Sequence, residues 1–201
     1  AIATLEKLIT ADSDRADILE MLGQLYQQND DYANTIKTLD RLEQLEGKSE
    51  RLSYAKSDIY TRQGNKKAAI SEMKKLADQY PNDLNYKGMY GDVLLMNGEA
   101  PKACAIFQDI LREEPDNNHA LVSLRAYYEQ EGQQEAADSV TLRILLNRNT
   151  SQEARVAIMR QEVNDSEEAG GDSTRVLHLF RQLMTLPLKD GDLPFLYAAY
   201  M

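Results

Sequence analysis

A period of 34 residues is the feature of this sequence that most constrains its fold. Gly64, Gly98 and Gly132 follow one another at this spacing, and the same spacing separates Pro81 from Pro115. A fixed period of this length is typical of proteins built from stacked helical repeats, because a single repeat cannot bury its apolar face alone. The chain can be written in 34-residue rows that start at Ala16, Glu50, Leu84 and Asn118.

The first half of each row predicts an amphipathic helix followed by a tight turn. In the first row, Leu19, Leu22, Gly23 and Tyr26 have the i, i+3, i+4, i+7 spacing that places side chains on one helical face. Four residues after the column of Tyr26, each row holds a turn residue. Glycine accepts a positive φ without a Cβ penalty, so this column predicts a chain reversal. Its members are Asp30, Gly64, Gly98 and Gly132.

The second half of each row predicts another amphipathic helix. In the third row, Ala103, Phe107 and Ile110 form an apolar stripe that ends before Pro115. Proline lacks the amide hydrogen that would continue the helix and restrains the residue before it. The corresponding closing positions in the four rows are Gly47, Pro81, Pro115 and Asn149. Each row therefore predicts a pair of antiparallel helices.

These columns resemble the tetratricopeptide repeat family, whose 34-residue pattern is W-x2-L-G-x2-Y, then A-x3-F, then P. The residues that carry the resemblance are Leu19, Leu22, Gly23 and Tyr26; Tyr60, Ala69, Met73 and Pro81; Tyr90, Gly91, Leu94, Ala103, Phe107 and Pro115; and Leu121, Leu124, Tyr128 and Ala137. The resemblance implies an all-α, right-handed α-solenoid of stacked antiparallel helix pairs. It also implies that the first helices line a concave face, which is the usual binding surface of such arrays.

The register predicts a single array over residues 1–201 whose two ends cut through a repeat, as in a fragment of a longer array. Residues 164–173 of the fifth repeat are expected to form a polar, acidic loop. The expected parts are a second helix of a truncated repeat at 1–15, repeats at 16–49, 50–83, 84–117 and 118–151, a degenerate repeat at 152–190, and a first helix of another truncated repeat at 191–201.

Several residues depart from the family pattern. Lys56 stands where the family has leucine, with Ser53 and Ser57 beside it, so the second row is expected to have a weakened apolar stripe. In the fourth row, Arg125 replaces a small residue at the closest approach of the two helices, and Thr141 replaces a large apolar one. The fourth pair is therefore expected to be looser.

The charge balance argues against two classes of partner. With 23 Lys and Arg against 33 Asp and Glu, the chain has a formal net charge of −10. This sign is wrong for neutralising the phosphates of nucleic acid or an anionic lipid surface. No apolar run approaches the roughly 18 residues of a membrane span, so direct membrane insertion is not expected.

The sequence contains no recognisable catalytic, cofactor-binding or metal-binding motif, and none of these functions is expected. His119, His178 and Cys104 have no nucleophile or paired carboxylate at a suitable spacing, and Cys104 is interpreted as a small hydrophobic residue in a second helix. No phosphate-binding GxxxxGK[ST] loop is present. A calcium ion could be gathered by loop carboxylates, although their spacing differs from an EF-hand and favours a solvated loop. These carboxylates are Asp165, Glu167, Glu168 and Asp172.

The candidate binding residues lie on the first helices of the third and fourth rows. We expect an apolar strip there with acidic edges, suited to a peptide or partner helix with apolar anchors and basic flanks. The alternative is that Leu95 and Met96 pack against the neighbouring repeat. This first-helix strip comprises Asp92, Leu95, Met96, Val122, Ala126 and Glu129.

The expected function is that of a non-catalytic protein–protein interaction scaffold that binds a peptide or partner protein. Two alternatives are a self-associating structural component and the regulatory arm of an enzyme whose catalytic domain lies outside these residues. Family members that bind chaperone C-terminal tails use Lys, Asn and Arg on first helices, and that partner is rejected because the comparable positions lack Lys and Arg. The location is open between a bacterial periplasm or cell envelope, which similar acidic arrays suggest, and the cytoplasm. The comparable positions are Glu20, Gln24, Ala55, Asn85 and Met89.

Overall fold

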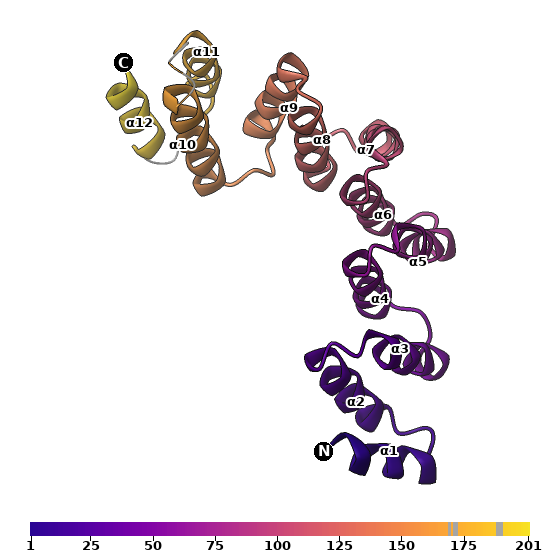
Figure 1. Ribbon diagram of the computed structural model, residues 1–201. Helices are drawn as coiled ribbons and strands as arrows, with labels where there is room; N and C mark the ends of the chain where they lie inside the picture. Colours follow the sequence, from indigo (N-terminus) through magenta and orange to yellow (C-terminus); the bar gives the residue numbers. More distant parts are fainter. Residues whose placement is uncertain (169, 171–172, 188–190) are drawn as a thin grey trace. The chain divides into compact units, whose positions relative to one another are not determined.

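The computed structural model describes residues 1–168, 170, 173–187 and 191–201, and in these ranges the regular structure is entirely α-helical (Figure 1). The predicted all-α class is confirmed, and successive helices pair through short turns. The twelve helices of the described residues are α1 (Ile2–Ala11), α2 (Ala16–Gln28), α3 (Tyr32–Glu46), α4 (Glu50–Arg62), α5 (Lys66–Gln79), α6 (Leu84–Met96), α7 (Ala100–Glu113), α8 (Asn118–Gln130), α9 (Gln134–Leu146), α10 (Gln152–Glu168), α11 (Ser173–Leu183) and α12 (Asp192–Tyr200).

The turns inside the predicted pairs share one backbone geometry. In the turn between the two helices of each pair, the middle residue has a positive φ. The values are 55° at Asp30, 72° at Gly64, 85° at Gly98 and 68° at Gly132. This conformation lets the next amide donate to a carbonyl five residues earlier, which satisfies a helix end. These hydrogen bonds are Asp31 N to Tyr26 O (2.9 Å), Asn65 N to Tyr60 O (2.8 Å), Glu99 N to Leu94 O (2.9 Å) and Gln133 N to Tyr128 O (2.8 Å).

Side-chain caps define where several helices begin. Asp31 accepts from the amide of Asn34 at the start of α3, and Asn65 accepts from Ala68 at the start of α5. Short polar side chains at these positions satisfy amides that have no partner within the helix. The turn column and the cap that follows it therefore act together to end one helix and begin the next. The same type of cap is provided by Ser49, Asp83 and Asn117.

The chain divides into two compact units, Ala1–Ala103 and Cys104–Met201. In the first unit, α2 packs on α3 and α4 packs on α5, while α1, α4 and α6 contact the neighbouring helices α2, α3 and α5 (Figure 1). Its first core cluster contains Leu19, Leu22, Leu42 and Leu52, all at most 3% exposed. A second cluster joins α5 and α6 through Met73, Leu76 and Val93.

The second unit pairs α8 with α9 and α10 with α11, and α12 packs on α10 (Figure 1). Phe180 of α11 is fully buried and its ring stacks on Tyr197 of α12 at 5.0 Å between centroids. Met159 and Leu193 complete this core and are also fully buried. The apolar stripes of α9 to α12 therefore converge on one cluster.

The predicted acidic loop at 164–173 begins later than expected. The α10 helix continues to Glu168, so residues 164–168 are helical. Ser166 is buried and its hydroxyl accepts a hydrogen bond from Tyr200 Oη at 3.4 Å. This contact explains why α10 gains an extra turn, since α12 packs beside its end. Asp172 lies outside the described residues.

The weakened stripe expected around Lys56 is replaced by a buried ion cluster within the first unit. The Lys56 ammonium pairs with Glu43 and lies 2.7 Å from Asp40 Oδ1 and 3.8 Å from Glu72 Oε1. Lys48 Nζ lies 2.9 Å from Glu43 and 2.5 Å from Glu72, which joins α3 to α5. Lys56 and Glu72 are 3% and 5% exposed, so these charges stabilise the fold only as a paired set.

The helices α8 and α9 pack on each other as the predicted fourth pair, and the looser packing expected there stays a prediction. Arg125 points its guanidinium away from the contact, placing Nε 2.6 Å from Glu129 and Nη2 3.0 Å from Glu162. Thr141 is buried at 1% exposure on α9. The ion pairs therefore let a large residue occupy the position of a small one.

Candidate functional site

The first-helix strip divides between the two compact units. On α6, Met96 is 66% exposed, whereas Asp92 and Leu95 are half-buried. The three residues follow an i, i+3, i+4 spacing and therefore share one side of α6. Met96 thus has a large apolar surface in water, while Leu95 has less surface to offer a partner.

The other half of the strip lies on α8. Val122 is 49% exposed, and Ala126 and Glu129 are also exposed. Their i, i+4, i+7 spacing places them on one side of the helix. Glu129 is held by Arg125, so its carboxylate is already partly neutralised. Each half therefore combines an exposed apolar residue with an acidic one.

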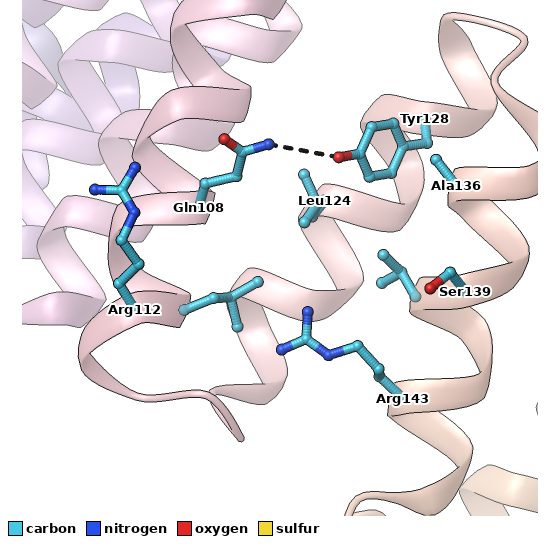
Figure 2. A pocket seen from close by; sticks show the side chains of 9 residues that line it. Gln108, Arg112, Leu124, Tyr128, Ala136, Ser139 and Arg143 are labelled. Atoms are coloured by element: carbon cyan, nitrogen blue, oxygen red, sulfur yellow. Dashed lines mark hydrogen bonds between the residues drawn. The ribbon is translucent and has the colours of Figure 1, made fainter.

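A groove that the repeat pattern does not predict lies within the second unit, between the second helices α7 and α9 and beside the first helix α8. It is a pocket of about 440 Å³ lined by residues of α7, α8 and α9 (Figure 2). We call it the α7–α9 groove. Its lining residues are Gln108, Leu111, Arg112, Leu124, Tyr128, Ala136, Ser139, Val140 and Arg143.

The α7–α9 groove has three chemically distinct parts. At one end, Gln108 Nε2 donates to Tyr128 Oη at 3.5 Å (Figure 2). The floor is formed by Leu111, Leu124 and Val140. At the other end lie the guanidinium groups of Arg112 and Arg143. The groove therefore combines a polar rim, an apolar floor and a cationic end.

Both arginines are oriented by contacts within the second unit. Arg112 Nη1 lies 2.5 Å from Asp109 Oδ1, one turn earlier on α7, and is 72% exposed. Arg143 Nη2 donates to the carbonyl of Pro115 at 3.1 Å. A guanidinium has five N–H donors, so each of these contacts leaves donors for another acceptor.

A sequence signal for the α7–α9 groove exists, although it is weak. The outward positions of the second helices in the third and fourth rows carry no carboxylate at the residues that line the groove. Carboxylates adjoin these positions at Asp109, Glu113, Glu135 and Asp138, so the signal is visible only once the lining residues are known. The family resemblance points to the first helices as the binding surface, so this signal on the second helices yields no prediction from the sequence.

A second polar pocket, of about 450 Å³, is closed by a paired ion network in the same unit. Glu162 is 2% exposed and accepts from Arg125 and Arg175, whose Nη2 lies 2.7 Å from it. Arg175 Nη1 also lies 2.7 Å from Asp138. Burial alone would lower the pKa of Arg175, but the charges of Glu162 and Asp138 outweigh it and raise that pKa. The network ties α8, α9, α10 and α11 together.

The residues considered for chemistry are Cys104 on α7, His119 on α8 and His178 on α11. Cys104 is half-buried, and burial raises the pKa of its thiol, which disfavours the reactive thiolate. His178 is exposed and His119 is half-buried. In the described part of the chain, no three His, Cys, Asp or Glu side chains are placed to hold a metal ion, including Asp165, Glu167 and Glu168. No helix among the described residues is both long and apolar enough to cross a bilayer.

Comparison with known proteins identifies the repeat. Residues 54–118 match the tetratricopeptide repeat family. No curated protein matches the sequence. A solved tetratricopeptide repeat protein from Parabacteroides merdae superposes with a TM-score of 0.59 and 12% identity, covering 100% of this chain and 76% of that one.

Two further solved structures share the fold. PilW, described as a widely conserved type IV pilus biogenesis factor, gives a TM-score of 0.57 at 15% identity, over 96% of this chain and 88% of that one. YrrB, described as a repeat protein with an unusual peptide-binding site, gives 0.50 at 13% identity, over the full length of both. Residues 54–118 therefore match the tetratricopeptide repeat family, and the likeness to these solved structures shows that the chain has the all-α helical repeat fold.

Proposed function

We propose that this chain is a non-catalytic scaffold that binds a peptide or partner protein on the concave face formed by its first helices. The observation that carries the proposal is the exposure of large apolar side chains on those helices. Met96 is 66% exposed on α6 and Val122 is 49% exposed on α8. Large exposed apolar side chains mark a binding surface where they belong to one contiguous patch, and the proposal is that these residues do.

The register adds a further residue to this face. Tyr54 of α4 occupies the same column as Val122, two rows earlier, and is 53% exposed. Aromatic residues of this kind carry much of the energy of many interfaces. YrrB, which shares the fold, is described as having a peptide-binding site, and this supports peptide recognition here.

The test replaces two apolar residues of the strip by aspartate. Met96→Asp and Val122→Asp are each expected to weaken a bound partner by about 2 kcal/mol, because a charge would be buried in the interface. Binding is measured by affinity capture from cells of the source organism, followed by titration of the captured partner. Circular dichroism is expected to show unchanged helicity, since both side chains are exposed.

A matched control makes the same change on a second helix. Leu45 of α3 is 42% exposed, so Leu45→Asp adds the same charge outside the proposed surface. The control should capture the same partners as the wild type. If the folded Met96→Asp/Val122→Asp variant also captures them with equal affinity, the binding face lies elsewhere.

A further inference from the structure

We infer that the α7–α9 groove is a second binding site, which takes an acidic segment of a partner protein anchored by one apolar side chain. This inference rests on the proposed function only in treating the chain as a protein-binding module, because the groove uses different residues from the first-helix strip and only α8 contributes to both. All nine of its lining residues belong to the second compact unit.

The size and shape of the groove suit a peptide side chain. Its volume of about 440 Å³ lies within the range of roughly 300–1,000 Å³ that is common for ligand sites. Leu111, Leu124 and Val140 form the floor and are 8%, 4% and 4% exposed, so they are held by the core and cannot easily rearrange. A pre-formed apolar floor lets an anchor side chain bind at a low ordering cost.

The charge of the groove determines which segment would bind beside this anchor. None of the nine described lining residues is Asp or Glu, and two are arginines, although the whole chain carries a net charge of −10. Arg112 and Arg143 each use one nitrogen in binding Asp109 and the Pro115 carbonyl. Their remaining donors suit a carboxylate, which an arginine fork can bind through two parallel hydrogen bonds.

A preference of the groove for acidic segments is opposite to what the net charge of the whole chain predicts, so it is a specific expectation. An acidic protein attracts basic segments over long distances. A lysine or arginine side chain in the α7–α9 groove would instead face the guanidinium groups of Arg143 and of Arg112, the second of which Asp109 partly neutralises. The local charges should therefore select glutamate or aspartate where the net charge alone would select lysine.

The test uses three fluorescein-labelled 12-residue peptides that differ only in the residues flanking a central leucine, which are glutamate, glutamine or lysine. Fluorescence anisotropy is measured with the full chain at low and high salt. The glutamate peptide is expected to bind at least about tenfold more tightly than the lysine peptide, an advantage that salt should reduce. The Arg112→Glu/Arg143→Glu variant should reverse this order.

Two further variants test whether the peptide binds in the α7–α9 groove itself. Ser139 is an exposed lining residue, so Ser139→Trp should block the glutamate peptide without changing any charge. Arg160 is exposed on α10 outside the groove. Arg160→Glu changes the net charge by the same amount as Arg112→Glu, and it should leave peptide binding unchanged within about twofold. Arg112→Glu alone tests the charge if the double variant fails to fold.

Several outcomes would overturn the inference. These are the absence of saturable glutamate-peptide binding up to millimolar concentration, tighter binding of the lysine peptide, or loss of binding in Arg160→Glu equal to that in Arg112→Glu. Loss of the peptide in Met96→Asp/Val122→Asp with no effect of Ser139→Trp would assign acidic segments to the first-helix strip. That last result would support the proposed function while contradicting the groove.

Discussion

Lys56 shows how one residue can look like a defect in the sequence and stabilise the structure. A lysine in an apolar column predicts weak packing, but here it is 3% exposed and paired with Glu43, Asp40 and Glu72. Its partners lie on α3 and α5. Glu43 is 13 residues before Lys56 in the sequence, and Glu72 is 16 residues after it. The repeat pattern could not predict the pairing, because it specifies apolar columns and says nothing about which charged side chains meet.

Replacing Lys56 by methionine should destabilise the protein strongly. The change keeps a long apolar stem but leaves the buried Glu72 and the partly buried Glu43 with fewer positive partners. Breaking a buried pair in this way typically costs about 3–5 kcal/mol, and the neighbouring Lys48 should hold the loss near the lower end. Urea unfolding of the two proteins at neutral pH measures the difference.

An exposed lysine provides the control for this change. Lys74 pairs with Asp78 at 2.6 Å, and both side chains are more than half exposed. Exposed ion pairs add little to stability, so Lys74→Met should leave the free energy of unfolding unchanged within the error of the measurement. Equal losses in the two variants would show that the buried cluster has no special role.

The buried cluster should also make stability depend on pH within defined limits. Burial opposes ionisation of Glu43, but hydrogen bonds from Lys56 and Lys48 outweigh it and lower the pKa of that carboxyl below its ordinary 4.5. Burial likewise opposes the charge on Lys56, but Asp40, Glu43 and Glu72 outweigh it and raise the pKa of that ammonium above its ordinary 10.5. Both groups are therefore charged together across the intervening range.

The sign of each shift sets the expected profile. A lowered carboxyl pKa contributes stability above pH 4.5 that is lost as the pH falls through the folded value. A raised ammonium pKa contributes stability below pH 10.5 that is lost as the pH rises through the folded value. The stability difference between wild type and Lys56→Met should be constant between these limits and shrink below the lower one. A difference that stays constant into acid would contradict the role of Glu43.

At the scale of the helix pair, the turn column is the element that the sequence predicts best. Gly64, Gly98 and Gly132 all have a positive φ, as their spacing predicts, and Asp30 adopts the same conformation at 55° without being a glycine. Local turn chemistry is readable because each turn needs one residue of a particular kind at one position. By contrast, the extent of α10 depends on a contact with α12, which no local pattern reveals.

Two opposite substitutions test the turn column. Asp30→Gly should stabilise the first turn by about 0.5–1 kcal/mol, because it removes the strain of a side chain at positive φ. The gain is limited by the loss of the exposed hydrogen bond from Tyr32 Oη to Asp30, at 2.9 Å. Gly132→Ala should destabilise the fourth-row turn by about 1 kcal/mol.

Gly132 is suited to this comparison because a Cβ there would meet no atom within 4 Å, so any loss comes from the backbone alone. Thermal unfolding of both variants measures the effects. Changes of the same sign in the two proteins would mean that the positive φ is not what selects glycine in this column.

At the scale of the whole molecule, the sequence predicts the fold class but not the division of the chain into two compact units. The 34-residue period continues across residue 103, and α7 runs from Ala100 to Glu113 as one helix, so nothing in the pattern marks the boundary between the two compact units. The repeat pattern does not predict the α7–α9 groove, for a related reason. Its character depends on charges from two different rows, which the columns of apolar residues do not record.

The two units provide the last prediction, which concerns how the chain unfolds. Within each unit, the helices in contact are adjacent in the chain or two apart, as expected when stability is a sum of nearest-neighbour terms. Leu52 of α4 and Phe180 of α11 are both fully buried, one in the core of each unit. Leu52→Ala should cost about 2–5 kcal/mol and Phe180→Ala about 3–5 kcal/mol, but in separate places.

Hydrogen exchange followed by mass spectrometry locates these losses along the chain. Leu52→Ala should speed amide exchange in α2 to α5 and leave α10 to α12 as in the wild type, whereas Phe180→Ala should do the reverse. The two variants serve as controls for each other, because both delete a buried side chain of a core. Faster exchange throughout the chain in either variant would show that the repeats unfold as one cooperative body. In that case, binding to the first-helix strip in one unit would also change the stability of the other unit. If each variant instead speeds exchange only in its own unit, the two units can bind independently.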